Sequence, residues 1–184
     1  MTFLEISATV LGLLQGFFIL LNKRSNWIFY ILQMICMIGF SLLNRLYGDC
    51  INSSIYLILG VVGYITWAKK ERKQIISCSI KEKVSYIFVI LIATTLLYQI
   101  LKNTNNQLPL IDAFTTISSF VATYYMIKRK LDTWLIWFVN DIAYVYEYLM
   151  LEQTAYYLMS LNIIWTFMAI ISYLNWSKIM KGAK

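Results

Sequence analysis

Histidine is absent from this chain of 184 residues, and cysteine and proline are scarce, with three and one. Without histidine the chain cannot build a Ser-His-Asp triad or a histidine-liganded metal site. Cys36, Cys50 and Cys78 show no paired spacing, so we expect three inert thiols. A phosphate-binding Gly-x-x-x-x-Gly-Lys-Ser/Thr loop is also missing, which argues against an ATP-driven pump. The sequence therefore predicts a protein that is not an enzyme and needs no cofactor.

Charge is scarce as well. Charged residues make up 14% of the chain, against about 25% in soluble domains. Hydrophobic residues make up 60%, and the mean hydropathy is +0.64. These values predict an all-α integral membrane protein, in which apolar runs cross about 30 Å of hydrocarbon. Seven such runs can be placed, at residues 3–21, 27–43, 51–68, 84–101, 109–127, 133–150 and 154–174.

The basic residues divide unequally between the two faces of this predicted membrane domain. Fourteen of the sixteen Lys and Arg residues fall on the face that holds the C-terminus, and only Arg45 and Lys102 fall on the other. Basic residues beside a span resist translocation. We therefore expect a multi-pass membrane protein with its N-terminus outside and its C-terminus in the cytoplasm. The net charge of +7 then reflects topology, and we expect no nucleic-acid partner.

The two halves of the chain repeat one another. The stretch "NWIFYILQM" at 26–34 aligns with "TWLIWFVND" at 133–141, and "GYITWAK" at 63–69 aligns with "SYLNWSK" at 172–178. The apolar fourth span has no counterpart. We predict seven transmembrane helices as 3+1+3 parallel repeats, because an odd linker helix lets both repeats share one orientation. The predicted parts are a first three-helix repeat at 1–78, a linker helix at 79–104 and a second three-helix repeat at 105–184.

The span at 133–150 is unusually polar for a membrane helix. A rotation of 100° per residue places its aromatic residues and Asp141 within an arc of about 80°; the residues are Trp134, Trp137, Asp141, Tyr144 and Tyr148. Near mid-membrane, a charge that faced lipid would cost at least about 2.5 to 3.5 kcal/mol. Asp141 should therefore face a cavity or a partner. One interpretation is a structural contact between helices; the one we favour is a site for a flat, cationic or hydrogen-bonding ring.

Other polar residues reach the same depth of the membrane. Gln33 is the repeat equivalent of Asn140, and Asn162 also falls near the middle of its span. Small residues of the span at 109–127, such as Thr115 and Ser119, are expected to permit close helix packing. The candidate substrate-binding residues are Trp27, Tyr30, Gln33, Trp134, Trp137, Asn140, Asp141, Tyr144 and Asn162.

Several stretches resemble the Pnu family of bacterial vitamin transporters. The similarity covers nearly the whole chain and is carried by "LYGDCINSSIY", "GYITW", "LPLIDAFTTISSFVATYYMIKRK" and "WLIWFVND". It implies two three-helix bundles joined by a linker, distantly akin to SWEET sugar transporters and often assembled as a homotrimer. It also implies a multi-pass protein of the bacterial inner (cytoplasmic) membrane and facilitated diffusion of an unphosphorylated vitamin precursor. By this resemblance Trp134, Trp137 and Asn140 or Asp141 contact the substrate.

The resemblance leaves more than one cargo open. Nicotinamide riboside and thiamine both contain a flat cationic ring, which Asp141 favours over neutral riboflavin or deoxynucleosides. Ser53 stands where the family usually has Gln, and Tyr64 stands where Trp is usual. We expect a nicotinamide riboside transporter in a lipid bilayer, with thiamine as the alternative cargo. Outside this class, the alternative is a membrane scaffold protein that transports nothing.

Overall fold

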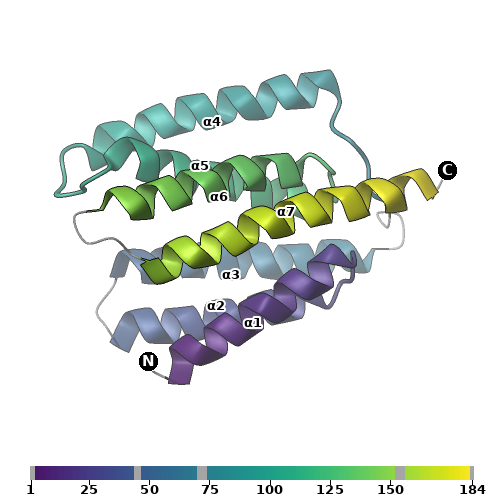
Figure 1. Ribbon diagram of the computed structural model, residues 1–184, viewed down its shortest axis with the longest axis horizontal. Helices are drawn as coiled ribbons and strands as arrows, with labels where there is room; N and C mark the ends of the chain where they lie inside the picture. The colour runs from purple at the N-terminus through teal and green to yellow at the C-terminus, as the bar shows by residue number, and fades with distance from the viewer. Residues whose placement is uncertain (1–2, 44–46, 70–73, 152–155, 183–184) are drawn as a thin grey trace. The chain divides into compact units, whose positions relative to one another are not determined.

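The computed structural model describes residues 3–43, 47–69, 74–151 and 156–182, and the regular structure in these ranges is helical. The helices, drawn in Figure 1, are α1 (Phe3–Leu20), α2 (Asn26–Leu43), α3 (Tyr47–Ala68), α4 (Ile80–Leu101), α5 (Pro109–Ile127), α6 (Thr133–Met150) and α7 (Tyr156–Gly182). The seven predicted helices are thereby confirmed. Within the described residues, α2, α3, α4, α5 and α7 are long and apolar enough to cross a membrane. α6 carries Asn140, Asp141 and Glu147, and such polar residues inside a membrane helix mark function more often than packing.

Helix α4 begins four residues before the apolar run that predicted it. Its first turn is closed by a capping box: the Ser79 hydroxyl accepts a hydrogen bond from the Glu82 N–H, at 3.3 Å. The Glu82 carboxylate in turn accepts from the Ser79 N–H, at 2.7 Å. This pairing satisfies two backbone donors at the helix start. The polar turn therefore extends the helix beyond its apolar segment.

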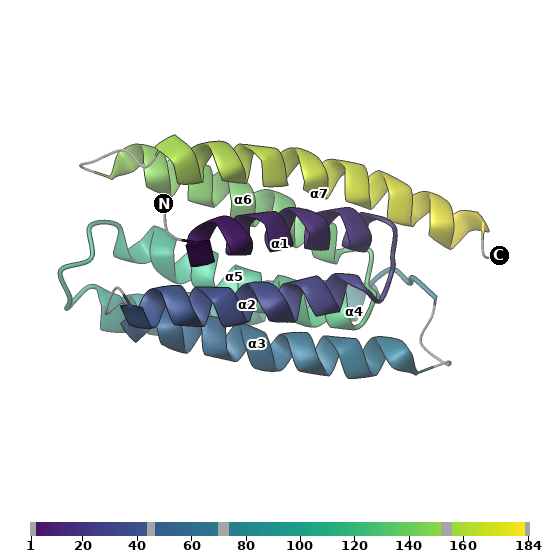
Figure 2. The same ribbon diagram turned by 90° about the horizontal axis from the view of Figure 1, so that it is seen from below.

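The chain forms two compact units, Met1–Lys73 and Gln74–Lys184. In the first unit α2 packs against both α1 and α3, and Figure 2 shows it between them. In the second unit α4 packs on α5, α5 on α6, and α6 on α7. In each repeat the middle helix, α2 or α6, is therefore the one that carries the repeated aromatic motif.

Equivalent tryptophans form the same contact in both units. Trp27 on α2 meets Trp67 on α3 edge to face, with ring centroids 5.7 Å apart and an interplanar angle of 82°. Trp134 on α6 meets Trp176 on α7 in the same way, at 5.3 Å and 89°. All four rings are buried. Edge-to-face packing of this kind adds about 0.5 to 1.5 kcal/mol beyond area burial, so the sequence repeat is also a packing repeat.

Gly63 on α3 provides the surface on which Trp27 lies. A Cβ atom built at Gly63 would lie 2.6 Å from three atoms of the Trp27 ring, closer than any normal contact. We expect Gly63→Ala to destabilise the protein by about 3 kcal/mol, because overpacking displaces a side chain that has no room to move. Thermal unfolding of the purified protein measures this loss. Gly182→Ala is the matched control, since a Cβ there meets nothing within 4 Å; equal melting temperatures for the two variants would contradict the packing argument.

A polar clasp joins the segment before α4 to the loop between α5 and α6. Ile76 pairs with Lys130 in a short parallel bridge, and the Leu131 N–H donates to the Ile76 carbonyl at 2.9 Å. The buried Asp132 carboxylate accepts from the Cys78 N–H at 2.6 Å and lies 3.1 Å from the Lys83 ammonium. These bonds fasten the start of α4 to the start of α6 within the second unit.

The contacts within this polar clasp also shift the pKa values of Asp132 and Cys78. Burial acts against ionisation of Asp132, yet the hydrogen bonds from the Cys78 N–H and Lys83 outweigh it and lower the pKa of this carboxyl. A carboxyl with a lowered pKa stabilises the fold above its ordinary pKa and loses that contribution as pH falls through the lowered value. Burial, followed by the charge of Asp132, raises the pKa of the Cys78 thiol to about 12. Cys78 is therefore a protonated thiol at neutral pH, and protonated thiols are poor nucleophiles.

Candidate functional site

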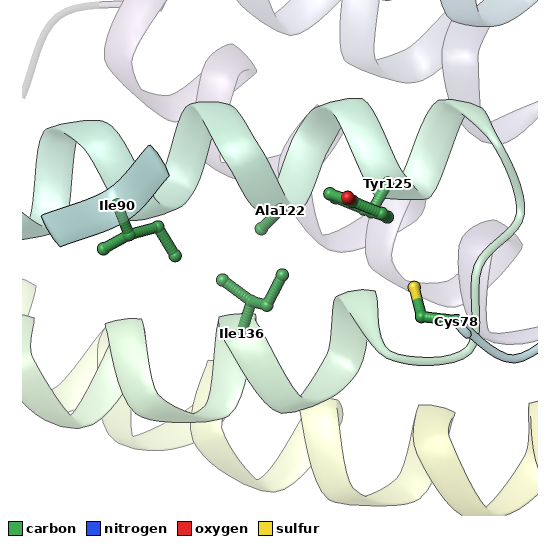
Figure 3. Close-up of a cluster of buried hydrophobic side chains, with 5 residues drawn as sticks. All are labelled: Cys78, Ile90, Ala122, Tyr125 and Ile136. Carbon is green, nitrogen blue, oxygen red and sulfur yellow. The ribbon is translucent and has the colours of Figure 1, made fainter. Parts of the chain in front are cut away.

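The candidate site is built on α6, whose position is set by its packing against α5. Figure 3 shows Ile136 of α6 pointing toward Ala122 of α5, in a buried cluster that also includes Ile90, Tyr125 and Cys78. Trp137 is half-buried and packs against this cluster. Since the side chain of Ala122 is small, the two helices can approach closely at this point. The packed side of α6 therefore gives the rest of the helix a fixed orientation.

One polar stripe of α6 is hydrogen-bonded to α5. The Asn140 amide nitrogen donates to the Thr115 carbonyl and to the Ser118 hydroxyl, both at 2.7 Å. This orientation of the amide follows from chemistry, because a carbonyl oxygen can only accept. Asn140 is fully buried, and its amide oxygen has no hydrogen-bond partner among the described residues. The amide nitrogen of Asn140 thus connects α6 to α5.

Asp141 lies on a different side of α6, about 100° further around the helix axis. Only 5% of the residue is exposed. Within the described part of the chain, no hydrogen bond or ion pair to its carboxylate is found. A buried carboxyl group without a partner is costly, and proteins retain such a group mainly where it has a task. Asp141 is therefore the strongest candidate for a ligand contact.

The aromatic residues on the Asp141 side of α6 differ in their surroundings. Trp134 is buried against Trp176, whereas Trp137 is half-buried. Both indole N–H groups are buried and have no acceptor among the described residues. Two turns further on, Tyr144 and Tyr148 stack with ring centroids 5.8 Å apart and an interplanar angle of 12°. A buried indole N–H usually finds a partner, so this side of α6 offers donors, flat rings and one carboxyl to a bound molecule.

Glu147 is a polar residue of α6 that was not among the predicted site residues. Its carboxylate accepts a hydrogen bond from the Thr115 hydroxyl, at 3.2 Å. It therefore belongs to the α5 side of the helix, as Asn140 does. The spacing of seven residues between Asn140 and Glu147 is the sequence signal that places the two on one side of a helix.

The predicted site residues of the first unit are each packed against a glycine. Trp27 lies on Gly63, as described above. A Cβ at Gly60 would lie 2.8 Å from Tyr30, and one at Gly12 would lie 2.7 Å from the Gln33 amide nitrogen. Trp27 and Tyr30 therefore face α3, and Gln33 faces α1. Their contact with a substrate stays a prediction.

The remaining predicted residues have these positions. Asn162 lies in α7, the helix that packs on α6, and is half-buried.

Tyr64, which departs from the family pattern, lies under the Arg24 guanidinium, which is 3.7 Å from the centre of the Tyr64 ring. The backbone carbonyl of Tyr64 accepts a hydrogen bond from Arg24 at 3.1 Å. Ser53, the other departure, is buried in α3. The Tyr64 position therefore has a structural role at the end of α3.

Among the described residues, the second unit therefore places a carboxyl without a partner, a half-buried tryptophan and a tyrosine pair on one side of a helix. Such a set can bind a flat ring by stacking and can compensate a positive charge on that ring. Among the described residues, no group of three or more acidic or cysteine side chains could hold a metal ion.

Comparisons with known proteins agree with this architecture. A family model described as "Nicotinamide mononucleotide transporter" matches residues 2–178. The nicotinamide riboside transporter PnuC of Neisseria mucosa is 23% identical over 188 residues, which cover 95% of this chain and 72% of the relative. The crystal structure of the vitamin B3 transporter PnuC superposes with a TM-score of 0.78 at 21% identity, over 98% of this chain and 83% of that one. The structural similarity confirms the predicted seven-helix fold.

Proposed function

Because the chain belongs to the nicotinamide mononucleotide transporter family, we propose that it is a uniporter for nicotinamide riboside. The proposal depends above all on Asp141, a buried carboxyl for which the described residues offer no hydrogen-bond or ion-pair partner, on the side of α6 that also carries Trp134, Trp137 and Tyr144. The pyridinium ring of nicotinamide riboside is flat and positively charged. The ring can provide a positive charge that pairs with the Asp141 carboxylate, while the flat face of the ring lies against Trp137. The further candidates for substrate contacts are Trp134, Asn140, Tyr144 and Asn162 of the second unit and Trp27, Tyr30 and Gln33 of the first.

A nucleoside fits this site better than a nucleotide. The phosphate of a mononucleotide is anionic and is normally bound by Arg or Lys. Neither α5 nor α6 contains a basic residue, and the acidic residue at the centre of the site repels an anion. An unphosphorylated cargo needs no basic partner and is not repelled by Asp141. The absence of basic residues from α5 and α6 therefore supports the riboside as the transported species.

Thiamine is the second candidate cargo, because its thiazolium ring is also flat and cationic. Asp141 and Trp137 recognise charge and planarity, which the two molecules share. Neutral riboflavin and deoxynucleosides lack the charge. A membrane scaffold that transports nothing is the remaining alternative, and an uptake assay distinguishes it from a carrier.

For the mechanism, we infer that the two three-helix repeats rock about a site near the membrane midplane, with outer and inner gates alternating.

The unequal distribution of basic residues supports an inner-membrane protein with an external N-terminus and a cytoplasmic C-terminus. The resemblance to the Pnu family supports a homotrimer as the assembled form. A kinase in the cytoplasm would trap the cargo, so that transport itself needs no energy source.

Uptake into proteoliposomes tests the proposal. We expect nicotinamide riboside to enter down its gradient without ATP and to stop at equal concentrations on the two sides. Preloading the liposomes with unlabelled nicotinamide riboside should accelerate entry of the labelled compound if the loaded carrier reorients faster than the empty one. Protein-free liposomes are the control. A strict requirement for ATP or an ion gradient, or uptake of thiamine alone, contradicts the proposal.

A further inference from the structure

The polar clasp of the second unit holds the first turn of α4 against the loop that precedes α6. Two ion pairs cross this contact. The Lys83 ammonium lies 3.1 Å from the Asp132 carboxylate, and the Lys130 ammonium lies 2.6 Å from the Glu82 carboxylate. Each of the two segments supplies one acidic and one basic residue. The charges of these four residues are therefore balanced within the clasp.

Asp132 is the most buried of these four residues, since only 3% of its side chain is exposed. Besides the ion pair with Lys83, its carboxylate accepts hydrogen bonds from the Cys78 N–H at 2.6 Å and the Ser77 hydroxyl at 3.1 Å. A buried charge that loses such partners is strongly destabilising, because its desolvation is no longer compensated. Opening the clasp in every transport cycle would therefore be unfavourable.

The main chain reinforces these side-chain contacts. The Ile76 N–H donates to the Arg129 carbonyl at 3.2 Å, and the Leu131 N–H donates to the Ile76 carbonyl at 2.9 Å. Both bonds join backbone atoms, so a change of side-chain rotamer cannot release them. The segment before α4 and the loop between α5 and α6 are therefore held in one fixed register.

Beyond the clasp, α4 is attached to α5 by side chains. Tyr86 of α4 meets Tyr125 of α5 edge to face, with ring centroids 5.5 Å apart and an interplanar angle of 72°. One turn later, Ile90 of α4 belongs to the buried cluster of Figure 3, together with Ala122 of α5 and Ile136 of α6. The first half of α4 is thus joined to both α5 and α6 within the second unit.

We propose that the polar clasp stays closed throughout the transport cycle, so that α4 moves with the second three-helix repeat as one rigid body and is not a free linker. This inference rests on the proposed function, because it concerns the rocking of the repeats. The moving body then begins before the predicted linker at 79–104, since Ile76 and Cys78 already bond to the loop between α5 and α6. The clasp also holds the start of α6, the helix that carries Trp137 and Asp141.

A reversible disulfide across the clasp tests this inference. Ile76 and Lys130 are paired in the parallel bridge, and paired strands lie about 4.7 to 4.9 Å apart, a distance that a disulfide can span. Ile76→Cys and Lys130→Cys are combined with Cys36→Ala, Cys50→Ala and Cys78→Ala, so that the new thiols have no other partner in the chain. Uptake of nicotinamide riboside into proteoliposomes is measured after oxidation with copper phenanthroline and again after reduction with dithiothreitol. We expect the two rates to agree within about twofold, because a crosslink that fits every state leaves their populations unchanged.

Hydrogen exchange of the wild-type protein measures opening of the clasp without any substitution. The Cys78 and Leu131 amides donate hydrogen bonds within the clasp, so their exchange reports its opening. We expect equally slow exchange, within about twofold, with and without nicotinamide riboside. Faster exchange in the presence of the ligand would overturn the inference.

Two lysines of the same turn provide a matched pair of variants. Lys83→Met removes one ion pair of the clasp and should speed exchange of the clasp amides about threefold, the effect of a pair with one exposed partner. Lys81 is exposed, and no ion pair to it is found in the described part of the chain, so Lys81→Met should leave exchange unchanged. Equal exchange in the two variants would contradict the role of the ion pair in keeping the clasp closed.

The outcomes separate this inference from the proposed function. If the reduced cysteine variant takes up nicotinamide riboside and the oxidised variant does not, the clasp opens in each cycle, and only the inference is overturned. Uptake of thiamine alone overturns the proposed cargo, and the oxidised and reduced forms are then compared with thiamine. If the wild-type protein takes up neither compound, the proposed function and the inference both fail. Should the cysteine variant fail to fold, hydrogen exchange of the wild-type protein decides.

Discussion

Asp141→Asn lowers the affinity for nicotinamide riboside by about 10- to 100-fold in our account, because interactions with a charged group contribute about 1.5 to 3 kcal/mol. The asparagine side chain is nearly isosteric with aspartate and removes only the charge. Calorimetric titration of the purified protein measures the change. The affinity for thiamine should fall by a similar factor, since it also presents a cationic ring.

Glu147→Gln is the matched control for this experiment. Glu147 is the other acidic residue within α6, but its carboxylate accepts a hydrogen bond from Thr115 and belongs to the α5 side of the helix. Its replacement should change cation affinity by less than about threefold, a small effect for an interaction away from the ligand. Equal losses for the two variants would mean that net negative charge, and not the position of Asp141, governs binding.

The second large effect is expected at Trp137. Trp137→Ala should weaken binding by about 1 to 3 kcal/mol if the substrate ring lies against the indole. Trp137 is half-buried, so its replacement should lower the melting temperature only moderately. Trp137→Phe keeps a flat face and should recover part of the affinity. Calorimetry and thermal unfolding, run on the same preparations, measure the two quantities.

Trp134 and Trp176 provide the comparison for Trp137. Trp134 is a candidate contact whose ring is also packed edge to face on Trp176, so Trp134→Ala should reduce both affinity and stability. Trp176 is fully buried and should affect stability more than affinity when replaced. If all three alanine variants lose affinity in proportion to their loss of stability, the effect is unfolding, and the stacking site is wrong.

Much of α6 could be predicted from the sequence, because its features are local. The bounds Thr133–Met150 follow from an apolar run, and helical rotation alone places Trp137 and Asp141 on one side. The repeat predicted that Trp27 and Trp134 are equivalent, and their matching contacts with Trp67 and Trp176 follow that equivalence. These predictions succeed because each depends on the order of residues within one helix or between two similar segments.

Contacts between distant segments could not be predicted in the same way. Asn140 was predicted as a substrate contact, and a structural contact between helices was the alternative for this span, but nothing within α6 reveals that Thr115 and Ser118 lie opposite Asn140. Thr115 and Ser118 can be assigned as its partners only once α5 and α6 are known to pack together in one register. Likewise, the basic residues of the loops were interpreted only as signals of membrane orientation. Lys83 also forms an ion pair at 3.1 Å with Asp132, a residue of a distant segment that the sequence did not identify as its partner.

The most direct test of this account is a comparison of two ligands that differ in charge at the ring. Nicotinamide riboside and its reduced 1,4-dihydro form have nearly the same shape, but reduction removes the positive charge from the pyridine ring. Calorimetric titration of the wild-type protein should give at least about tenfold tighter binding of the oxidised, cationic form, the factor that corresponds to about 1.4 kcal/mol from the contact with Asp141. Equal affinities, or tighter binding of the reduced form, would contradict the claim that this buried carboxyl selects a cation.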